Sequence, residues 1–344
     1  MNKKIIAIIA GGDSSEHDVS MRSAAGISSW LNRDKYIVYI IETRGLEWNA
    51  ILEDGSLSPI NRHDFSFIDN NKKIIPDFAY ITIHGTPGEN GILQGYFELL
   101  HIPYSSCNVL VAALTFDKFA NNHYLRRFGV KVADSILLRK GQEISDEDVI
   151  TRVGLPCFIK PNEAGSSFGV TRVTNKENIQ DAIKFARKEF GDVMIEAELK
   201  GIEIANGVFR KANGEIHVLP ITEVVSKNEF FDYDAKYNGQ VEEITPARLS
   251  PETTNRVKSL TKSIYTILGG SGIMRVDYII TKSVHEHGVL VENQTSTVDV
   301  INLLEINATP GMTATSFIPQ QAKVDGLEMS YILDEVIESK MKEK

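Results

Sequence analysis

The sequence predicts an α/β protein whose N-terminal third is built around a parallel sheet. Strand-like apolar runs occur at Ile5–Ile9, Tyr36–Glu42 and Phe78–Ile83. Between the first two runs lies a helix with its buried face at helical spacing, marked by Val19, Ser23, Ile27 and Leu31. Alternation of strand, loop and helix is typical of an α/β layer. Because ligands bind at the carboxyl ends of such strands, the loops 11–17 and 84–95 are candidate binding loops.

Composition excludes several classes of protein. The chain has 344 residues, 42% hydrophobic and 24% charged, which is ordinary for a globular protein of one to three domains. A net charge of −9 gives no basic footprint for nucleic acid. The two cysteines do not make a disulfide framework, which favours a reducing compartment. The apolar run Ile5–Ala10 is too short for a signal peptide, and no run approaches the ~20 residues of a membrane span. We therefore expect a cytoplasmic protein without a membrane partner.

In the middle of the chain, the sequence predicts a helical segment at 109–129, followed by strands at Asp134–Leu138 and Pro156–Lys160. A capping box from Thr174 to Glu177 predicts the start of a helix that ends at Gly191. The polar loop between them, 161–169, offers backbone amides and hydroxyls that suit a phosphate cradle. No Gly-Lys-Ser/Thr follows it, so it is not a Walker loop, and a plain hairpin turn is an equal alternative.

The last part of the chain predicts strands at Val193–Glu196, Glu203–Arg210 and Ile273–Ile280. Ser250 and Pro251 form a helix start, and Gly269 ends that helix. Residues 227–240 are predicted to form a long polar and aromatic loop. An amphipathic helix is expected near the C-terminus, at Leu327–Ile337.

The segment Leu303–Pro319, LLEINATPGMTATSFIP, carries the clearest chemistry. Glu305 and Asn307 are two residues apart on a predicted strand, so they point the same way. Asp277 and Arg275 lie on another predicted strand, expected beside the first. Converging carboxylate and carboxamide oxygens suit Mg²⁺, and Arg275 could stabilise an anionic transition state. The alternative is an Arg–Glu–Asp salt-bridge network, which leaves Asn307 and the turn at Gly311 unexplained.

Seven collinear motifs resemble the D-alanine–D-alanine ligase family of the ATP-grasp superfamily. They are GGDSSEHDVS (11–20), HGTPGENGILQGYFE (84–98), IPY (102–104), IKPNEAGSSFGV (159–170), FFDYDAKY (230–237), MRVD (274–277) and LEINATPGMTATS (304–316). The resemblance implies an N-terminal Rossmann-like parallel-sheet domain followed by a two-part ATP-grasp fold. The implied limits are 1–105 for the first domain, 106–191 for the central subdomain, and 192–344 for the C-terminal subdomain with a lid loop at 227–240.

The resemblance also implies the reaction, ATP-dependent joining of two D-alanine molecules for peptidoglycan synthesis, and a role for each matching residue. For the metal and ATP, the residues are Asp277, Glu305 and Asn307 as ligands of two Mg²⁺ (or Mn²⁺), Lys160 and Lys236 on the phosphates, Glu196 and Leu199 at the adenine, and Glu203 at the ribose. For the amino acids, they are Glu16 on the first ammonium, Arg275 and the Gly311 amide on the oxyanion, and Ser316 on the second carboxylate. Ser166 and Tyr237 would hydrogen-bond with Glu16 and lock the lid.

Two of the departures from the family pattern bear most on the predicted site. Asn122 stands where the family usually has a second phosphate-contacting lysine, and Lys118 or Arg126 could replace that charge. The chain between Asp277 and Glu305 is also longer than the family's short hairpin, and 281–302 reads as an extended β-hairpin. Within it, Glu292 and Asn293 imitate the metal motif but are adjacent, so they face opposite ways. His285 and His287 are two possible metal ligands without a third, and an exposed tip explains them better.

Several readings remain open at this point. Lys236-Tyr237 is the form found in dipeptide-forming members, so we expect D-alanine rather than D-lactate as the second substrate. One competing hypothesis is a nucleotide-binding protein that has lost catalysis, with Asn122 as the symptom. Another is an ATP-grasp ligase acting on a different carboxylate, which does not account for Glu16 together with Ser316. The resemblance further implies a homodimer formed through the first domain.

Overall fold

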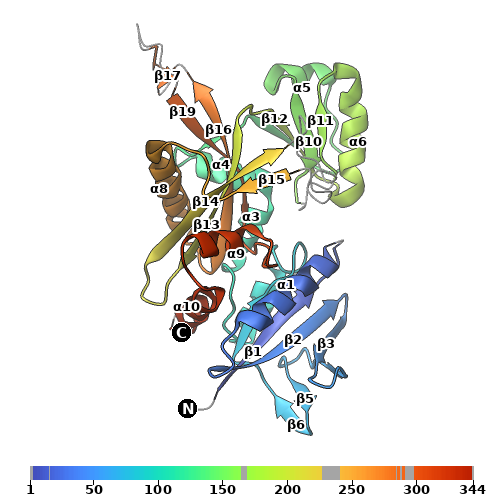
Figure 1. Cartoon of the computed structure of the whole chain (residues 1–344). Helices are drawn as coiled ribbons and strands as arrows, with labels where there is room; N and C mark the ends of the chain where they lie inside the picture. Colours follow the sequence, from blue (N-terminus) through green and yellow to red (C-terminus); the bar gives the residue numbers. More distant parts are fainter. Residues whose placement is uncertain are drawn as a thin grey trace.

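The computed structural model describes residues 3–14, 16–163, 169–226, 241–283, 285–286, 289–290 and 298–342. They form a mixed α/β fold with three main sheets (Figure 1). None of the helices among these residues combines the length and hydrophobicity that a membrane span requires.

The first sheet has the strand order β4-β3-β2-β1-β7. Its members are β1 (Lys4–Gly11), β2 (Tyr36–Arg44), β3 (Glu47–Ile51), β4 (Leu57–Pro59) and β7 (Phe78–Ile81), and β5 (Phe67–Asp69) and β6 (Lys72–Ile74) form a separate hairpin. β1 pairs in parallel with both β2 and β7, which confirms the predicted parallel sheet. The helix α1 (His17–Trp30) buries Ser20, Ser23, Ala24 and Ile27, so the predicted buried face is correct except that Val19 is only partly buried. Side chains of α2 (Ile92–Leu99) join a different core cluster, with Ala7 and Ile9 of β1.

The second sheet is antiparallel, in the order β11-β10-β12-β9, and packs against α5 (Asp146–Arg152) and α6 (Ile179–Phe190). Its strands are β9 (Ser135–Leu138), β10 (Cys157–Pro161), β11 (Thr171–Val173) and β12 (Val193–Ala197). The predicted capping box is wrong. Glu177 lies within a 3₁₀ turn, η1 (Lys176–Asn178), and α6 begins only after Asn178, its N-cap residue. Gly191 ends α6 with a positive φ of 86°, as predicted.

The third sheet has the order β15-β14-β13-β16-β19-β8. Its strands are β8 (Lys131–Val132), β13 (Ile202–Arg210), β14 (Ile216–Ser226), β15 (Val241–Ile244), β16 (Ile273–Ser283) and β19 (Val298–Asn307). β17 (His285–Glu286) pairs with β18 (Val289–Leu290) beyond the end of β16. The pairing of β16 with β19 as far as Ser283 and Val298 supports the predicted extended hairpin.

Helices cover both faces of this third sheet. α8 (Pro251–Leu268) packs on one face, and Ser250 caps it by accepting a hydrogen bond from the Thr253 amide, as predicted. α9 (Phe317–Val324) and α10 (Met329–Lys342) contribute to the core cluster on the other face. The predicted helical segment 109–129 is two helices, α3 (Val109–Phe116) and α4 (Lys118–Arg126). They separate at Asp117, whose extended backbone and carboxylate cap α4.

One hydrophobic cluster joins the first and third sheets. Ile6 and Ile8 of β1 and Ile27 of α1 belong to the same buried cluster as Phe209 of β13 and Ile318 of α9. The predicted domain limits at residues 105 and 191 remain a prediction. The strands do not follow these limits strictly, because β8 pairs with β19 and β12 pairs with β9 and β10.

Candidate functional site

The predicted metal-binding side chains lie on two neighbouring antiparallel strands. Asp277 of β16 pairs directly with Glu305 of β19, and Arg275 pairs with Asn307. A β-bulge separates these pairs from Tyr278, which pairs with Leu303, so Leu304 is the extra residue. In a regular strand Leu303 and Glu305 would share a face. The bulge instead lets Leu303 enter the core beneath α8 while Glu305 and Asn307 face the other side.

The Asp277 carboxylate accepts several hydrogen bonds from its neighbours. It accepts them from Arg275 Nε (2.8 Å) and Arg275 Nη2 (2.7 Å), and from Asn307 Nδ2 (3.1 Å). Burial alone would lower the pKa of Arg275, but the Asp277 carboxylate outweighs burial and raises it. The Arg–Asp part of the network expected as the alternative to a metal site is therefore present, and it includes Asn307.

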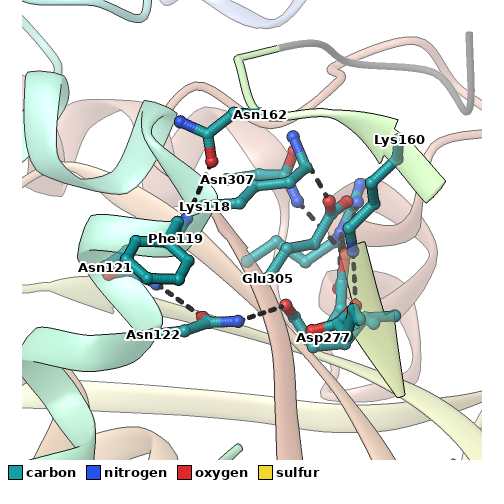
Figure 2. A network of polar contacts seen from close by, with 12 residues as sticks. Lys118, Phe119, Asn121, Asn122, Lys160, Asn162, Asp277, Glu305 and Asn307 are labelled. Atoms are coloured by element: carbon teal, nitrogen blue, oxygen red, sulfur yellow. Dashed lines mark hydrogen bonds and ion pairs between the residues drawn. The ribbon is translucent and has the colours of Figure 1, made fainter. Parts of the chain in front are cut away.

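Lys118 and Glu89 complete the charged lining. The ammonium of Lys118, at the start of α4, lies 3.8 Å from Glu305 Oε2. Both side chains are labelled in Figure 2. Burial lowers the pKa of Lys118. The Glu89 carboxylate lines a cavity of about 30 Å³ with Lys118, Glu305 and Asn307. Burial, aided by the negative charges of Glu16 and Glu305, raises the pKa of Glu89 to about 8.

Glu89 is not among the site residues predicted from the sequence. Lys118 is predicted only as one of two residues that could replace the family's second phosphate-contacting lysine. The structure separates these two replacements. Arg126 donates to the carbonyl of Ala133 and pairs with Asp134, away from Glu305. Asn122 is buried and donates a long hydrogen bond of 3.5 Å to the carbonyl of Leu304, the extra residue of the bulge. Asn122 thus contacts the β19 backbone, and Lys118 is the cation of α4 that reaches the carboxylates.

The predicted nucleotide residues lie where the second and third sheets meet. Lys160 of β10 donates to Glu196 of β12 at 2.6 Å, and both side chains are buried (Figure 2 shows Lys160). Burial opposes a charged ammonium, but the Glu196 carboxylate raises the pKa of Lys160 overall. Leu199 lies in the connection from β12 to β13, and Glu203 lies near the start of β13. Lys160 and Glu196 therefore belong to the second sheet, Glu203 belongs to the third, and Leu199 lies in the chain that connects them.

The predicted amino-acid residues lie on the face of the third sheet that meets α1. Glu16 is the N-cap residue of α1. Farther along α1, Ser23 Oγ accepts a hydrogen bond from the Met312 amide at 3.3 Å, which ties this helix to the turn that contains Gly311. Ser316 is the N-cap residue of α9, and its hydroxyl lies 2.8 Å from the Thr313 hydroxyl. Segments from opposite ends of the chain therefore meet here, and the Phe317 ring that follows Ser316 lies 5.1 Å from the Arg275 guanidinium.

Some predicted residues lie outside the part of the chain that the structure describes. These are Ser166 in the candidate phosphate loop, Lys236 and Tyr237 in the predicted lid, and Glu292, Asn293 and His287 in the insertion. Among the described residues, no three His, Cys, Asp or Glu side chains gather as a metal site by themselves. A divalent ion at Asp277 and Glu305 would therefore also need Asn307 and oxygens from a ligand, which is how Mg²⁺ is commonly held beside phosphates.

Comparison with known proteins identifies the family. The family model described as D-ala D-ala ligase N-terminus matches residues 5–107, and the model described as D-ala D-ala ligase C-terminus matches residues 124–338. The chain belongs to the D-alanine–D-alanine ligase family. The resemblance seen in the sequence motifs is thereby confirmed.

Relatives within the D-alanine–D-alanine ligase family match along the whole chain. A D-alanine–D-alanine ligase of Phocaeicola vulgatus is 58% identical over 338 residues, covering 98% of this chain and 99% of the relative. The crystal structure of the VanG D-Ala:D-Ser ligase from Enterococcus faecalis is 31% identical, with a TM-score of 0.83 over 98% of this chain and 99% of that chain. A D-alanine–D-alanine ligase from Bacillus anthracis complexed with ATP is 29% identical, with a TM-score of 0.75 over 99% of this chain and 98% of that one.

Proposed function

We propose that this protein joins two molecules of D-alanine into D-alanyl-D-alanine, with conversion of ATP to ADP and phosphate, for peptidoglycan precursor synthesis. The observation that carries the proposal is the pairing of Asp277 with Glu305 on β16 and β19, beside Arg275 and Asn307. Facing carboxylates repel each other, and a divalent cation removes that cost. The family and the strongly similar D-alanine–D-alanine ligases support the same activity.

Asp277, Glu305 and Asn307 would hold two Mg²⁺ (or Mn²⁺) ions. Their donor set fits these ions, because it consists of hard oxygen ligands that converge from two paired strands. When bound, the ions would neutralise charge on the phosphates of ATP. The hydrogen bond from Asn307 Nδ2 to Asp277 implies that the carboxamide must reorient to present its oxygen.

ATP would lie between the second and third sheets, in the manner of a two-part ATP-grasp fold that follows a Rossmann-like N-terminal domain. Lys160 would contact the phosphates, with Lys236 on the γ-phosphate from the lid. Glu196, Leu199 and Glu203 would hold the adenine and ribose along the junction. Asn122 has no positive charge to offer the phosphates. Lys118 would supply that charge instead, because its ammonium lies 3.8 Å from Glu305, one of the proposed metal ligands.

The two amino acids would bind where α1 meets the Gly311 turn. Glu16 would hold the ammonium of the first D-alanine, and Ser316 would bind the carboxylate of the second. Arg275 and the Gly311 amide would stabilise the oxyanion. Ser166 and Tyr237 would complete the network around Glu16 when the lid closes.

The reaction follows from these positions. A carboxylate oxygen of the first D-alanine attacks the γ-phosphorus of ATP, and ADP leaves, so that an acyl phosphate forms. The unprotonated amine of the second D-alanine then attacks the acyl carbon. The tetrahedral intermediate expels inorganic phosphate, and the nitrogen loses a proton as the peptide bond is completed. Because acyl phosphates hydrolyse readily, closure of the lid at 227–240 would protect the intermediate from water.

Three further features belong to the same proposal: the domain limits given above, a cytoplasmic location, and a homodimer formed through the first domain. For the dimer, the exposed apolar side chains Ile92 and Leu99 of α2 are a candidate contact surface. Light scattering of the purified protein, alone and with Leu99→Glu, tests the dimer, which the variant should weaken.

The activity is tested by measuring ADP release and product formation at neutral pH with D-alanine, D-serine or D-lactate offered as the second substrate, where the first two give a dipeptide and D-lactate gives a depsipeptide. We expect D-alanine to be used fastest. Faster turnover with D-lactate would refute the assignment of the second substrate, and Tyr237→His should shift preference toward D-lactate. ATP binding without any D-alanine-dependent turnover would instead support a nucleotide-binding protein that has lost catalysis.

A further inference from the structure

Gln321 lies in the middle of α9, fully buried between that helix and the third sheet. Its carboxamide nitrogen donates to the carbonyl of Ala205 (2.9 Å) and to the hydroxyl of Thr222 (3.0 Å). Its carboxamide oxygen accepts from the amide of Gly207 (2.9 Å). Both N–H donors and the oxygen are therefore used, and an aliphatic side chain of the same size would leave these polar groups without their partner.

These contacts are made at an irregularity in the sheet. The register of β13 against β14 shifts between Asn206 and Val208, so the Gly207 amide falls at a break in that ladder. Gln321 supplies an acceptor there. Asn206 performs the complementary task by donating to the carbonyl of Leu219 at 2.8 Å. Gln321 thus makes hydrogen bonds to the backbone of β13, although it belongs to the helix α9.

The other edge of the same β13 segment carries the candidate active site. Ala205 pairs with Asp277 of β16, and Gly207 pairs with Arg275. Gln321 therefore bonds to the two residues of β13 that lie directly beside the proposed metal ligand and the proposed oxyanion-stabilising arginine.

The first residue of α9, Phe317, also contacts Arg275. The Arg275 guanidinium lies 5.1 Å from the centroid of the Phe317 ring. Ser316, the N-cap of α9, is five residues before Gln321, which corresponds to ~7.5 Å along a helix. A shift of α9 relative to β13 would consequently move Ser316 relative to Arg275.

Gly207 and Gln321 approach each other closely. A Cβ atom on Gly207 would lie 2.6 Å from both the Gln321 oxygen and Ile318 Cδ1. Even an alanine at this position would therefore force these side-chain ends to shift and would disturb the hydrogen bond between the Gly207 amide and the Gln321 oxygen.

We propose that Gln321 is a positioning residue that sets the distance between Ser316 and Arg275, and so aligns the second amino acid with the acyl phosphate. The assignment rests on the proposed function. It predicts that loss of Gln321 impairs the second half of the reaction, attack by the amine, much more than the first half, formation of the acyl phosphate.

The two halves can be measured separately in the full-length enzyme. Hydroxylamine converts the acyl phosphate to D-alanine hydroxamate, and it has no carboxylate for Ser316 to bind. Hydroxamate formation at low D-alanine therefore reports the first half, and dipeptide formation at varied D-alanine reports both. We expect Gln321→Met to keep hydroxamate formation near the wild-type rate and to lower kcat/KM for dipeptide formation by about 100-fold, the scale of an ångström-sized misplacement.

Two further variants separate positioning from stability. Gly207→Ala keeps Gln321 but crowds its carboxamide oxygen, so it should disturb the same contact and give the same imbalance, and it also tests the proposal if Gln321→Met fails to fold. Tyr265→Phe removes a buried hydrogen bond to the Gly272 carbonyl (2.8 Å) in the cluster on the α8 face of the sheet, so it should lower stability without the imbalance. Equal loss of hydroxamate and dipeptide in both α9-interface variants would overturn the assignment. A wild-type enzyme that forms hydroxamate but no dipeptide would overturn the proposed function itself.

Discussion

Replacing Glu305 by glutamine should separate the stability of the free protein from its use of metal. In the free protein, Glu305 is attracted by Lys118 at 3.8 Å and repelled by Asp277 on the paired strand. With an effective dielectric constant near 20, the attraction is ~4 kcal/mol. Repulsion between facing side chains about 5 Å apart is ~3 kcal/mol. These two nearly cancel, and Arg275 and Lys160 add further attraction that is weaker than the attraction each has to its own carboxylate partner. Glu305→Gln should therefore lower the free energy of unfolding by only ~1–2 kcal/mol.

Metal binding should respond very differently to the same substitution. Loss of groups that merely orient metal ligands costs about 10- to 100-fold in affinity, so loss of one of two charged ligands should cost at least ~100-fold, or ~3 kcal/mol. The assay is D-alanine-dependent ADP release over a range of Mg²⁺ concentrations, with chemical denaturation in parallel. Glu252→Gln, an exposed carboxylate in the first turn of α8, is the matched control. An unchanged Mg²⁺ dependence together with a large loss of stability would refute the metal assignment and favour a structural ion-pair network.

Four other substitutions test the charged lining of the site. Arg275→Met and Asp277→Asn should each lower the free energy of unfolding by roughly 3 kcal/mol, and the double variant by less than the sum, because each single change leaves a buried charge unpaired; denaturation of all three measures this. Glu89, with a pKa raised to about 8, stabilises the free protein below its ordinary pKa and loses that contribution as pH rises toward 8. Glu89→Gln should therefore gain ~3–4 kcal/mol in the free energy of unfolding over wild type between pH 5 and pH 8 without ATP or metal, and no relative gain in denaturation experiments would contradict the raised pKa. Lys118→Met should raise the KM for ATP at least ~10-fold by removing a charge from the phosphates, whereas an unchanged KM would exclude Lys118 from the phosphate site.

Local sequence signals predicted much of the fold. Ser250 and Pro251 marked the start of α8, because capping depends on residues adjacent in the chain. The alternation of side chains along a strand was enough to place Glu305 and Asn307 on one face. Thr174 and Glu177 failed as a capping box, because a 3₁₀ turn intervened before α6. Such short turns have little local signature.

Features that depend on contacts between distant segments were not predictable in the same way. The bulge at Leu304, which turns Glu305 away from the core face of Leu303, depends on the register of β16 against β19. The raised pKa of Glu89 depends on burial by segments far from it in sequence. Gln321 carried no sequence signal, because its partners Ala205, Gly207 and Thr222 lie about 100 residues earlier.

The central claim, that the first D-alanine is activated as an acyl phosphate, is tested most directly with oxygen isotopes. The enzyme is given ATP and D-alanine labelled with ¹⁸O at both carboxylate oxygens, and the inorganic phosphate is analysed by mass spectrometry. The account predicts one ¹⁸O atom in each phosphate released during dipeptide formation, because that oxygen leaves the acyl carbon with the phosphoryl group. Unlabelled phosphate, or label in AMP instead, would contradict it.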